Sequence, residues 1–296
     1  MKINTLKYIS LLFLAMLSSK AIAQQDPSFS LYQFNMNIIN PAYAGSSETT
    51  EATAMIRSQW TGIENAPSTQ TLSFSSPTVL GKNMGLGFSI VNDKFNIAKE
   101  TAVSLDFSYK LPLSENQSLF LGLKAGGSFF NVELASLQIN DPLFSKNISS
   151  FNPNFGVGAY LKGKNYYASL SVPALLKSSR YQKDGNTITE ASDKPHIYLS
   201  SGYIFDLDGV YNAKLTPSFM MRYVSGVPVS FDITVITNVL EKYEIGVSHR
   251  FQESVSFFGL FKFLDHYKIG YAYEYTTTDI SIYSSGSHEF VFKYHF

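Results

Sequence analysis

The segment that closes the chain, residues 286–296, alternates between two kinds of side chain. Because neighbouring residues of a strand face opposite sides, one face of this segment is aromatic and the other is mostly charged. The two faces are His288, Phe290, Phe292, Tyr294 and Phe296 against Glu289, Val291, Lys293 and His295. A soluble sheet buries its apolar face in a core, whereas a transmembrane barrel turns it toward lipid. The pattern recurs along the chain and predicts an all-β fold, a transmembrane antiparallel β-barrel.

Period-two alternation predicts about 14 strands. It is clearest in Ala102–Leu111, Leu215–Val224 and Tyr267–Tyr275. The other expected strands are 50–60, 67–76, 84–93, 118–131, 153–163, 165–174, 196–206, 228–239, 242–251, 254–264 and 286–296. If both ends of the barrel domain lie in the periplasm, the short links fall on the periplasmic side. The two longest links, 132–152 and 175–195, then fall outside, as in bacterial barrels.

The amino-terminal residues have the pattern of an export signal. Lys2 and Lys7 precede a short apolar run over 8–17, and Ala21-Ile-Ala23 fits a cleavage site. We therefore expect a signal peptide over 1–23, a mature start near Gln24 and an outer-membrane location. The expected organisation is a non-barrel segment over 24–49 followed by a barrel over 50–296.

The composition and motifs of the chain argue against several kinds of binding site and catalytic site. There are no cysteines, which removes disulfides and thiolate ligands. Without Lys2, Lys7 and Lys20 the mature part keeps 20 basic against 23 acidic residues, so it has no basic field for nucleic acid. The five histidines show no HxxxH spacing, and no GxSxG nucleophile elbow occurs. We expect no enzymatic activity, no cofactor and no metal.

Two patterns concern the inside of the barrel. Inward positions carry charges of both signs, which predicts a salt-bridged, water-bearing lumen more than a selective pore lining of one sign. They are Asp106, Lys110, Lys124, Arg222, Asp232, Glu244, Arg250, Lys268, Glu274, Glu289 and Lys293. The glycine pairs Gly85/Gly87 and Gly156/Gly158 stand inside strands, where glycine marks a bulge, a bend or a close approach.

Residues 24–49 do not alternate. They combine turn-starting pairs, such as Asn40-Pro41, with much apolar surface, including Phe29, Tyr32 and Tyr43. This composition favours a segment that packs inside the lumen or beneath the barrel, or one that presents a partner site. Trp60, the one tryptophan, falls at the end of the first expected strand, where it serves as an interface anchor, a packing residue or a partner contact.

Several strings resemble the PorP/SprF family over essentially the whole mature chain. They are QDPSFSLYQFNMNIINPAYAGS, RSQWTGIENAPSTQTLSFSSP, INDPLF, NPNFGVGAYLKGKNYYASLSVP, HIYLSSGYIF, KYEIGVSHR, KIGYAYEY and GSHEFVFKYHF. The resemblance implies an outer-membrane component of type IX secretion and gliding motility. It would dock or anchor secreted adhesin-type proteins with C-terminal sorting domains and contact periplasmic ring or motor-linked parts. The alternative is a passive porin or small-molecule transporter.

The motif positions of that family mark the candidate partner-binding residues. The resemblance places them at Asp26, Pro27, Phe29, Tyr32, Asn35, Asn40, Pro41, Tyr43, Gln59, Trp60, Asp141, Pro142 and Phe144. Proline, glycine and asparagine positions also encode turns, so a structural role is the competing interpretation. We also expect outer-membrane lipid to contact the aromatic faces of the strands.

Overall fold

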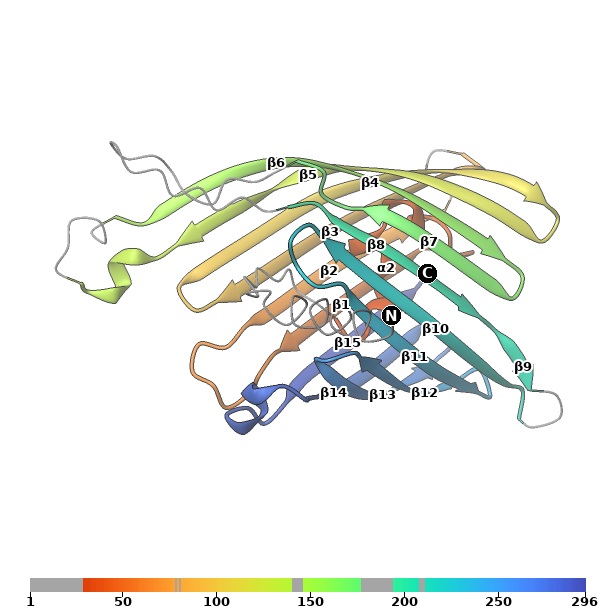
Figure 1. Cartoon of the computed structure of the whole chain (residues 1–296). Helices are drawn as coiled ribbons and strands as arrows, with labels where there is room; N and C mark the ends of the chain where they lie inside the picture. The colour runs from red at the N-terminus through yellow and green to blue at the C-terminus, as the bar shows by residue number, and fades with distance from the viewer. Residues whose placement is uncertain (1–28, 78, 80, 140–145, 177–193, 208–210) are drawn as a thin grey trace, which may run out of the picture.

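The strands close into one antiparallel barrel (Figure 1). The computed structural model describes residues 29–77, 79, 81–139, 146–176, 194–207 and 211–296. Each strand pairs with its neighbours in sequence, except that β8 and β9 do not pair with each other, and β1 pairs with β15 to close the ring. The strands are β1 (Glu51–Ser58), β2 (Ser68–Ser76), β3 (Met84–Phe95), β4 (Ala98–Ser114), β5 (Gln117–Val132), β6 (Ile148–Gly163), β7 (Tyr166–Val172), β8 (His196–Tyr203), β9 (Phe205–Leu207), β10 (Ala213–Val224), β11 (Ser230–Val239), β12 (Tyr243–Arg250), β13 (Ser254–Phe263), β14 (Tyr267–Thr276) and β15 (Ser287–His295).

The expected count of fourteen strands is confirmed. β8 and β9 both pair with β10 and are separated by Ile204 alone, so they form one interrupted wall strand. The three longest strands, β4, β5 and β6, have 17, 16 and 16 residues and exceed the lengths that the sequence predicted. Figure 1 shows β5 and β6 projecting beyond the rest of the wall at one end, on the left of the view.

Alternation places apolar side chains outside and polar ones inside, as lipid requires. In β15, Phe290 is 55% exposed while the neighbouring Glu289 is 1% exposed. β4 repeats the contrast with Leu105 outward and Asp106 buried. The sequence therefore gives each strand a lipid face and a lumen face, and the expected barrel orientation of these side chains is confirmed.

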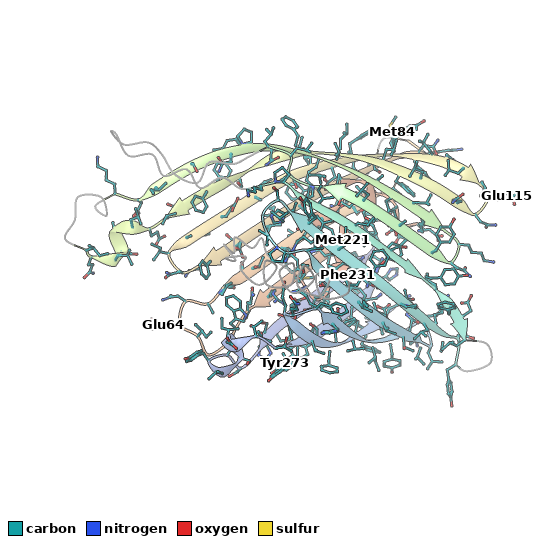
Figure 2. All side chains as sticks on the ribbon, viewed as in Figure 1. Glu64, Met84, Glu115, Met221, Phe231 and Tyr273 are labelled. Carbon is teal, nitrogen blue, oxygen red and sulfur yellow. The ribbon has the colours of Figure 1, made fainter. Side chains whose placement is uncertain are left out.

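The two ends of the barrel differ. The backbone nitrogen of Phe296 donates to the carbonyl of Thr50, so the barrel domain begins and ends at the same rim. By the convention for bacterial barrels this is the periplasmic rim, called the inner end below. The connections that contain 133–147 and 173–195 lie at the opposite, outer end; residues 140–145 and 177–193 of these loops are outside the described residues. Figure 2 shows Glu64 at the outer end and Glu115 at the inner end.

Residues 29–49 lie inside the ring of strands and are called the plug. They form three short helical turns, η1 (Tyr32–Phe34), α2 (Met36–Ile39) and η2 (Pro41–Tyr43). Two further turns, η3 (Leu134–Leu137) and η5 (Asp279–Ile282), lie in outer loops. Of the two placements that the sequence allowed, inside or beneath the barrel, the plug takes the first. The plug fills part of the lumen, and a cavity lies on either side of it.

Candidate functional site

The outer end of the plug is held by two carboxylates of the wall. The backbone nitrogens of Ser30 and Leu31 donate to the two oxygens of Glu289, at 2.7 and 3.0 Å. The hydroxyl of Ser30 donates to Glu274 at 2.8 Å. Hydrogen bonds to an ionised acceptor are stronger than those between neutral groups. Glu289 therefore acts as a two-point latch on the plug backbone.

The same carboxylates belong to a buried network of opposite charges. Arg57 pairs with Glu289 and, at 2.7 Å, with Glu274. Arg250 contacts Asp232 through two nitrogens, at 2.9 and 3.0 Å, and lies 3.7 Å from Glu274. Each charge has a partner, as burial in a low-dielectric interior demands. This confirms the expected salt-bridged lumen, although Arg57 was not among the residues predicted for it.

A hydrophobic cluster joins the plug to the wall beside this network. Phe29, Leu31, Tyr32 and Met36 pack with inward apolar residues. The wall residues are Met55, Tyr198, Met220, Ile236, Phe258, Leu260, Ala272 and Val291. Burying one large apolar side chain contributes about 1.5–3 kcal/mol, so four such residues are a substantial anchor.

The middle of the plug is fixed by two asparagines that contact nearby strands of the wall. Asn35 donates to Thr71 at 2.9 Å and accepts from Ser73 at 2.7 Å. Asn37 donates to Asp106 at 3.0 Å, and Lys124 pairs with the same carboxylate at 2.9 Å. The two asparagines therefore attach the middle of the plug to β2 and to the β4–β5 pair, on one side of the ring.

The inner end of the plug lies against glycines of three strands. A Cβ at Gly122 would overlap the backbone nitrogen of Ala42, one at Gly158 the side-chain oxygen of Asn40, and one at Gly85 the carbonyl of Ala44. These contacts confirm the close approach that in-strand glycines predicted at Gly85 and Gly158.

Asn40 fixes the turn that makes this approach. Its side-chain oxygen accepts from the nitrogen of Ala42 at 2.9 Å and so caps η2. Its amide donates to the carbonyl of Ala159 and, at 2.7 Å, to the hydroxyl of Ser169. Tyr43 packs edge-on against Tyr160, and burial raises the pKa of the Tyr43 phenol, which therefore stays neutral.

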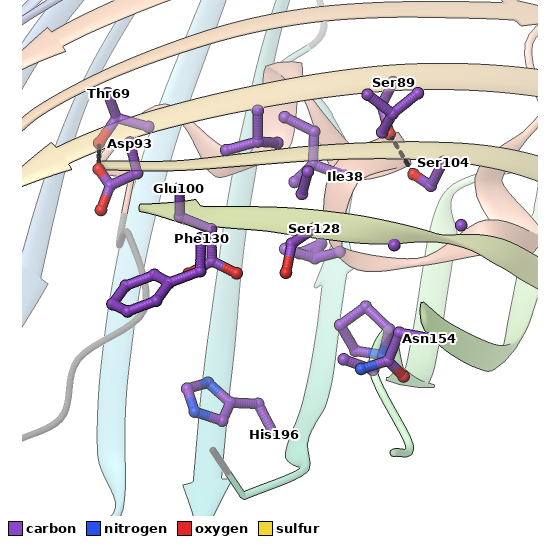
Figure 3. A pocket seen from close by; sticks show the side chains of 18 of the residues that line it. Ile38, Thr69, Ser89, Asp93, Glu100, Ser104, Ser128, Phe130, Asn154 and His196 are labelled. Carbon is purple, nitrogen blue, oxygen red and sulfur yellow. Dashed lines mark hydrogen bonds between the residues drawn. The ribbon is translucent and has the colours of Figure 1, made fainter. Parts of the chain in front are cut away.

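A cavity of about 550 Å³ lies on the outer side of the plug. We call it the vestibule. Phe29, Ile38 and Ile39 belong to the plug and form its floor, and residues of β2–β6 and β8 form its walls. Aromatic side chains line it beside charged ones, namely Trp60, Phe95, Phe130, Tyr198, Asp93, Lys99, Glu100, Lys124, Lys194 and His196. Figure 3 shows Phe130, Glu100 and His196 around this space, with Thr69 bonded to Asp93.

A second, more polar cavity of about 420 Å³ lies at the inner end. The last plug residues, Ser46–Glu48, form one side of it. The inner turns of β3–β6 form the other side and contribute Lys82, Lys110 and Lys162. The Nζ of Lys162 donates to the carbonyl of Ser46 at 2.8 Å. Glu48 and Glu115 also line this cavity, so the plug separates an aromatic outer cavity from a polar inner one that carries both charge signs.

The structure divides the predicted partner-binding residues into three groups. Phe29, Tyr32, Asn35, Asn40 and Pro41 are buried in plug contacts, and Tyr43 packs on the wall. Gln59 and Trp60 line the vestibule. Asp26, Pro27, Asp141, Pro142 and Phe144 lie outside the described residues. Their role as partner contacts stays a prediction. In the described part of the chain, no cluster of three potential His, Asp or Glu metal ligands occurs.

No helix within the described ranges has the length and apolarity to cross a membrane. The spanning unit is the barrel, and a closed 14-stranded antiparallel wall with a lipid-facing apolar surface defines an outer-membrane β-barrel protein.

The family follows from a match over nearly the whole chain. Residues 21–294 match the family described as type IX secretion system membrane protein PorP/SprF, and the chain belongs to that family. A search of curated proteins gave no match.

Solved structures share the barrel fold at low sequence identity. The monoaromatic hydrocarbon channel CymD has a TM-score of 0.50 and 11% identity, covering 87% of this chain and 91% of its own. Omp33 of Acinetobacter baumannii has a TM-score of 0.49 and 9% identity, covering 85% and 100%. A FadL homologue of Pseudomonas aeruginosa has a TM-score of 0.45 and 12% identity, covering 93% and 94%. At these identities the likeness concerns the fold alone.

Proposed function

We propose that this barrel is a non-enzymatic docking component of type IX secretion. It holds secreted proteins with C-terminal sorting domains at the cell surface and contacts periplasmic ring or motor-linked parts. Family membership supports the link to the secretion machinery. The single structural observation that carries the docking role is the plug, which contacts β2–β7 and β13–β15 from inside the ring.

A filled lumen favours docking over passive transport. An open porin needs a continuous aqueous path, and the plug residues Leu31, Ala42 and Ala44 have no exposed surface. The vestibule instead offers aromatic side chains, which are enriched in protein-binding surfaces. The inner cavity offers lysines and backbone groups to a periplasmic partner.

The second candidate is a small-molecule transporter. One observation favours it: CymD, which has a similar fold, is a monoaromatic hydrocarbon channel. The aromatic vestibule fits such a solute in size and chemistry. This candidate requires that the plug move, because its contacts close the space below the vestibule.

A binding experiment with a matched control tests the docking role. Phe130 lines the vestibule, whereas Phe129 faces outward from the adjacent position of β5 and is 59% exposed. With a purified sorting domain and barrel tagged in an outer loop, Trp60→Ala and Phe130→Ala should weaken binding about tenfold or more, as truncated aromatic anchors do. Phe129→Ala should leave the affinity unchanged. Equal affinities for all three variants would contradict docking in the vestibule.

Recovery from native membranes tests the whole proposal. A tag in an outer loop leaves Phe296 untouched, and mild detergent keeps complexes together. We expect sorting-domain proteins or periplasmic ring proteins to co-purify. A barrel that purifies alone and conducts in a planar bilayer would favour the transporter.

A further inference from the structure

β6 has a wall neighbour on both sides over only part of its length. It pairs with β5 from Ile148 to Gly163, whereas β7 pairs with it only from Val157 to Lys162. Among the described residues, the outer part of β6, residues 148–156, therefore has no strand paired on the side of β7. Figure 1 shows this part of β6 in the projecting end of the wall. An open sheet edge of this kind is a template for another strand.

The contact at the end of β7 shows which backbone groups face this side. The nitrogen of Leu175 donates to the carbonyl of Phe155 at 2.8 Å, so the backbone of Phe155 points away from β5. Backbone groups alternate between the two sides of a strand, and β6 pairs with β5 without a register shift. The backbone groups of Ser149, Phe151 and Pro153 therefore point the same way. We call residues 149–153 the open edge.

Asn154 marks the point where pairing within the chain ends. Its side-chain oxygen accepts from the backbone nitrogens of Phe155 and Leu176, at 2.9 and 3.0 Å, and its amide donates to the carbonyl of Leu176 at 3.0 Å. Beyond it, the outward-pointing backbone groups of the open edge have no hydrogen-bond partner within the described ranges. Pro153 agrees with an edge position, because proline has no N–H to donate to a neighbouring strand.

The side chains beside the open edge define the chemistry of a matching strand. Phe151 and Phe155 face outward and are 55 and 56% exposed, whereas Asn152 faces inward and is buried. Aromatic side chains stabilise apolar neighbours across a strand pair. Asn154 and Leu176 also line the vestibule, so the open edge borders this cavity. The edge therefore fits an extended segment that is apolar on one face and polar on the other.

We propose that the open edge of β6 pairs with an extended segment of the secreted protein that the barrel holds. The proposal rests on the docking function given above and adds the contact through which the barrel binds its partner. The segment continues the β6–β7 pairing outward from Leu175, spans about five residues and forms a side wall of the vestibule. In such strand addition, main-chain hydrogen bonds provide affinity and alternate side chains provide specificity.

Removal of one N–H from the open edge tests the proposal. Ser149→Pro removes an N–H that points away from β5, whereas the control Ser149→Ala keeps it; Ser149 is exposed. With the purified sorting domain as the probe, Ser149→Pro should weaken binding about tenfold, and Ser149→Ala should leave the affinity unchanged. The shift in gel mobility on heating shows whether both variants are folded.

The same binding measurement separates this proposal from the docking function. Equal affinities of Ser149→Pro and Ser149→Ala would overturn pairing at the open edge. If Trp60→Ala and Phe130→Ala still weaken binding in that case, docking in the vestibule stands without the edge contact. If those two variants also bind normally, docking in the vestibule fails as well.

Amide hydrogen exchange, followed by NMR on the purified barrel, tests which backbone groups the partner covers. The N–H groups of Ser149 and Phe151 should exchange rapidly in the barrel alone and at least tenfold more slowly in its complex with the sorting domain. The N–H groups of Ser150 and Asn152 face β5 and should exchange slowly in both states. Slow exchange of Ser149 and Phe151 in the barrel alone would show that the edge is already covered. That result, or unchanged exchange in the complex, would overturn the proposal.

Discussion

The outer end of the plug is attached through ionised side chains, whereas its inner end is attached through close contact between backbones. Glu289 and Glu274 hold Ser30 and Leu31, and the carboxylates in turn depend on Arg57. At the other end, Gly122, Gly158 and Gly85 let Ala42, Asn40 and Ala44 approach the wall.

The two attachments fail in different ways. A charged latch loses its strength when one partner is neutralised, because the remaining charge stays buried without compensation. A close-packed contact fails when atoms are added, because neither backbone can yield without losing its hydrogen bonds. We therefore expect the outer end of the plug to detach from the wall when one of its charged partners is neutralised. The inner end should stay attached under the same change.

The largest effect is expected at the latch. Glu289→Ala removes both acceptors of the plug backbone and one partner of Arg57. Breaking a buried ion pair in this way costs about 3–5 kcal/mol of unfolding free energy. Urea titration of the purified barrel, followed by the shift in gel mobility, measures this change. Glu64→Ala, at an exposed position in an outer loop, should stay within about 0.5 kcal/mol. A small effect of Glu289→Ala would mean that the latch does not hold the plug.

A smaller effect is expected at the glycine contact. Gly122→Ala adds a methyl group where the backbone of Ala42 lies, and overpacking of this kind costs roughly 1–3 kcal/mol. Gly259 provides the control, because a Cβ there would be 3.9 Å from the carbonyl of Glu244, an ordinary contact. The same urea titration should separate the two variants. Equal stabilities would show that the plug backbone moves freely away from β5.

The smallest of the three effects is expected at Asn40. Asn40→Ala removes the cap of η2 and leaves the hydroxyl of Ser169 without its donor. Loss of a cap and of a buried hydrogen bond costs about 1–2 kcal/mol. Asn116→Ala, in an exposed inner turn, is the matched change. If Asn40→Ala exceeds Glu289→Ala in the urea titration, the inner end carries more of the attachment than the outer end.

The wall could be predicted from the sequence because lipid imposes a rule on every strand. Outward residues must be apolar, so strands such as 102–111 and 267–275 were visible as alternation. The same rule explains why β4, β5 and β6 are longer than the sequence predicted. Beyond the bilayer both faces are solvated, and β4 therefore continues to Ala98 and Ser114 without an alternating signal.

The position of the plug could not be predicted from the sequence in the same way, because its partners are distant in the chain. Ser30 and Glu289 are separated by 259 positions, and no local pattern joins them. Arg57 was missed for the same reason. The in-strand glycines did give a signal, since a bulge, a bend or a close approach was expected at Gly85 and Gly158. The sequence did not distinguish among these three or say that the approaching segment was the plug.

Conductance in a planar bilayer tests whether residues 29–49 close the lumen. The full-length barrel should insert without opening a measurable channel, whereas a barrel that lacks 29–46 should conduct steadily. Should the deletion not assemble, Glu289→Ala combined with Gly122→Leu displaces the plug at both ends and should conduct as well. Equal conductance of the full-length barrel and these variants would contradict the account.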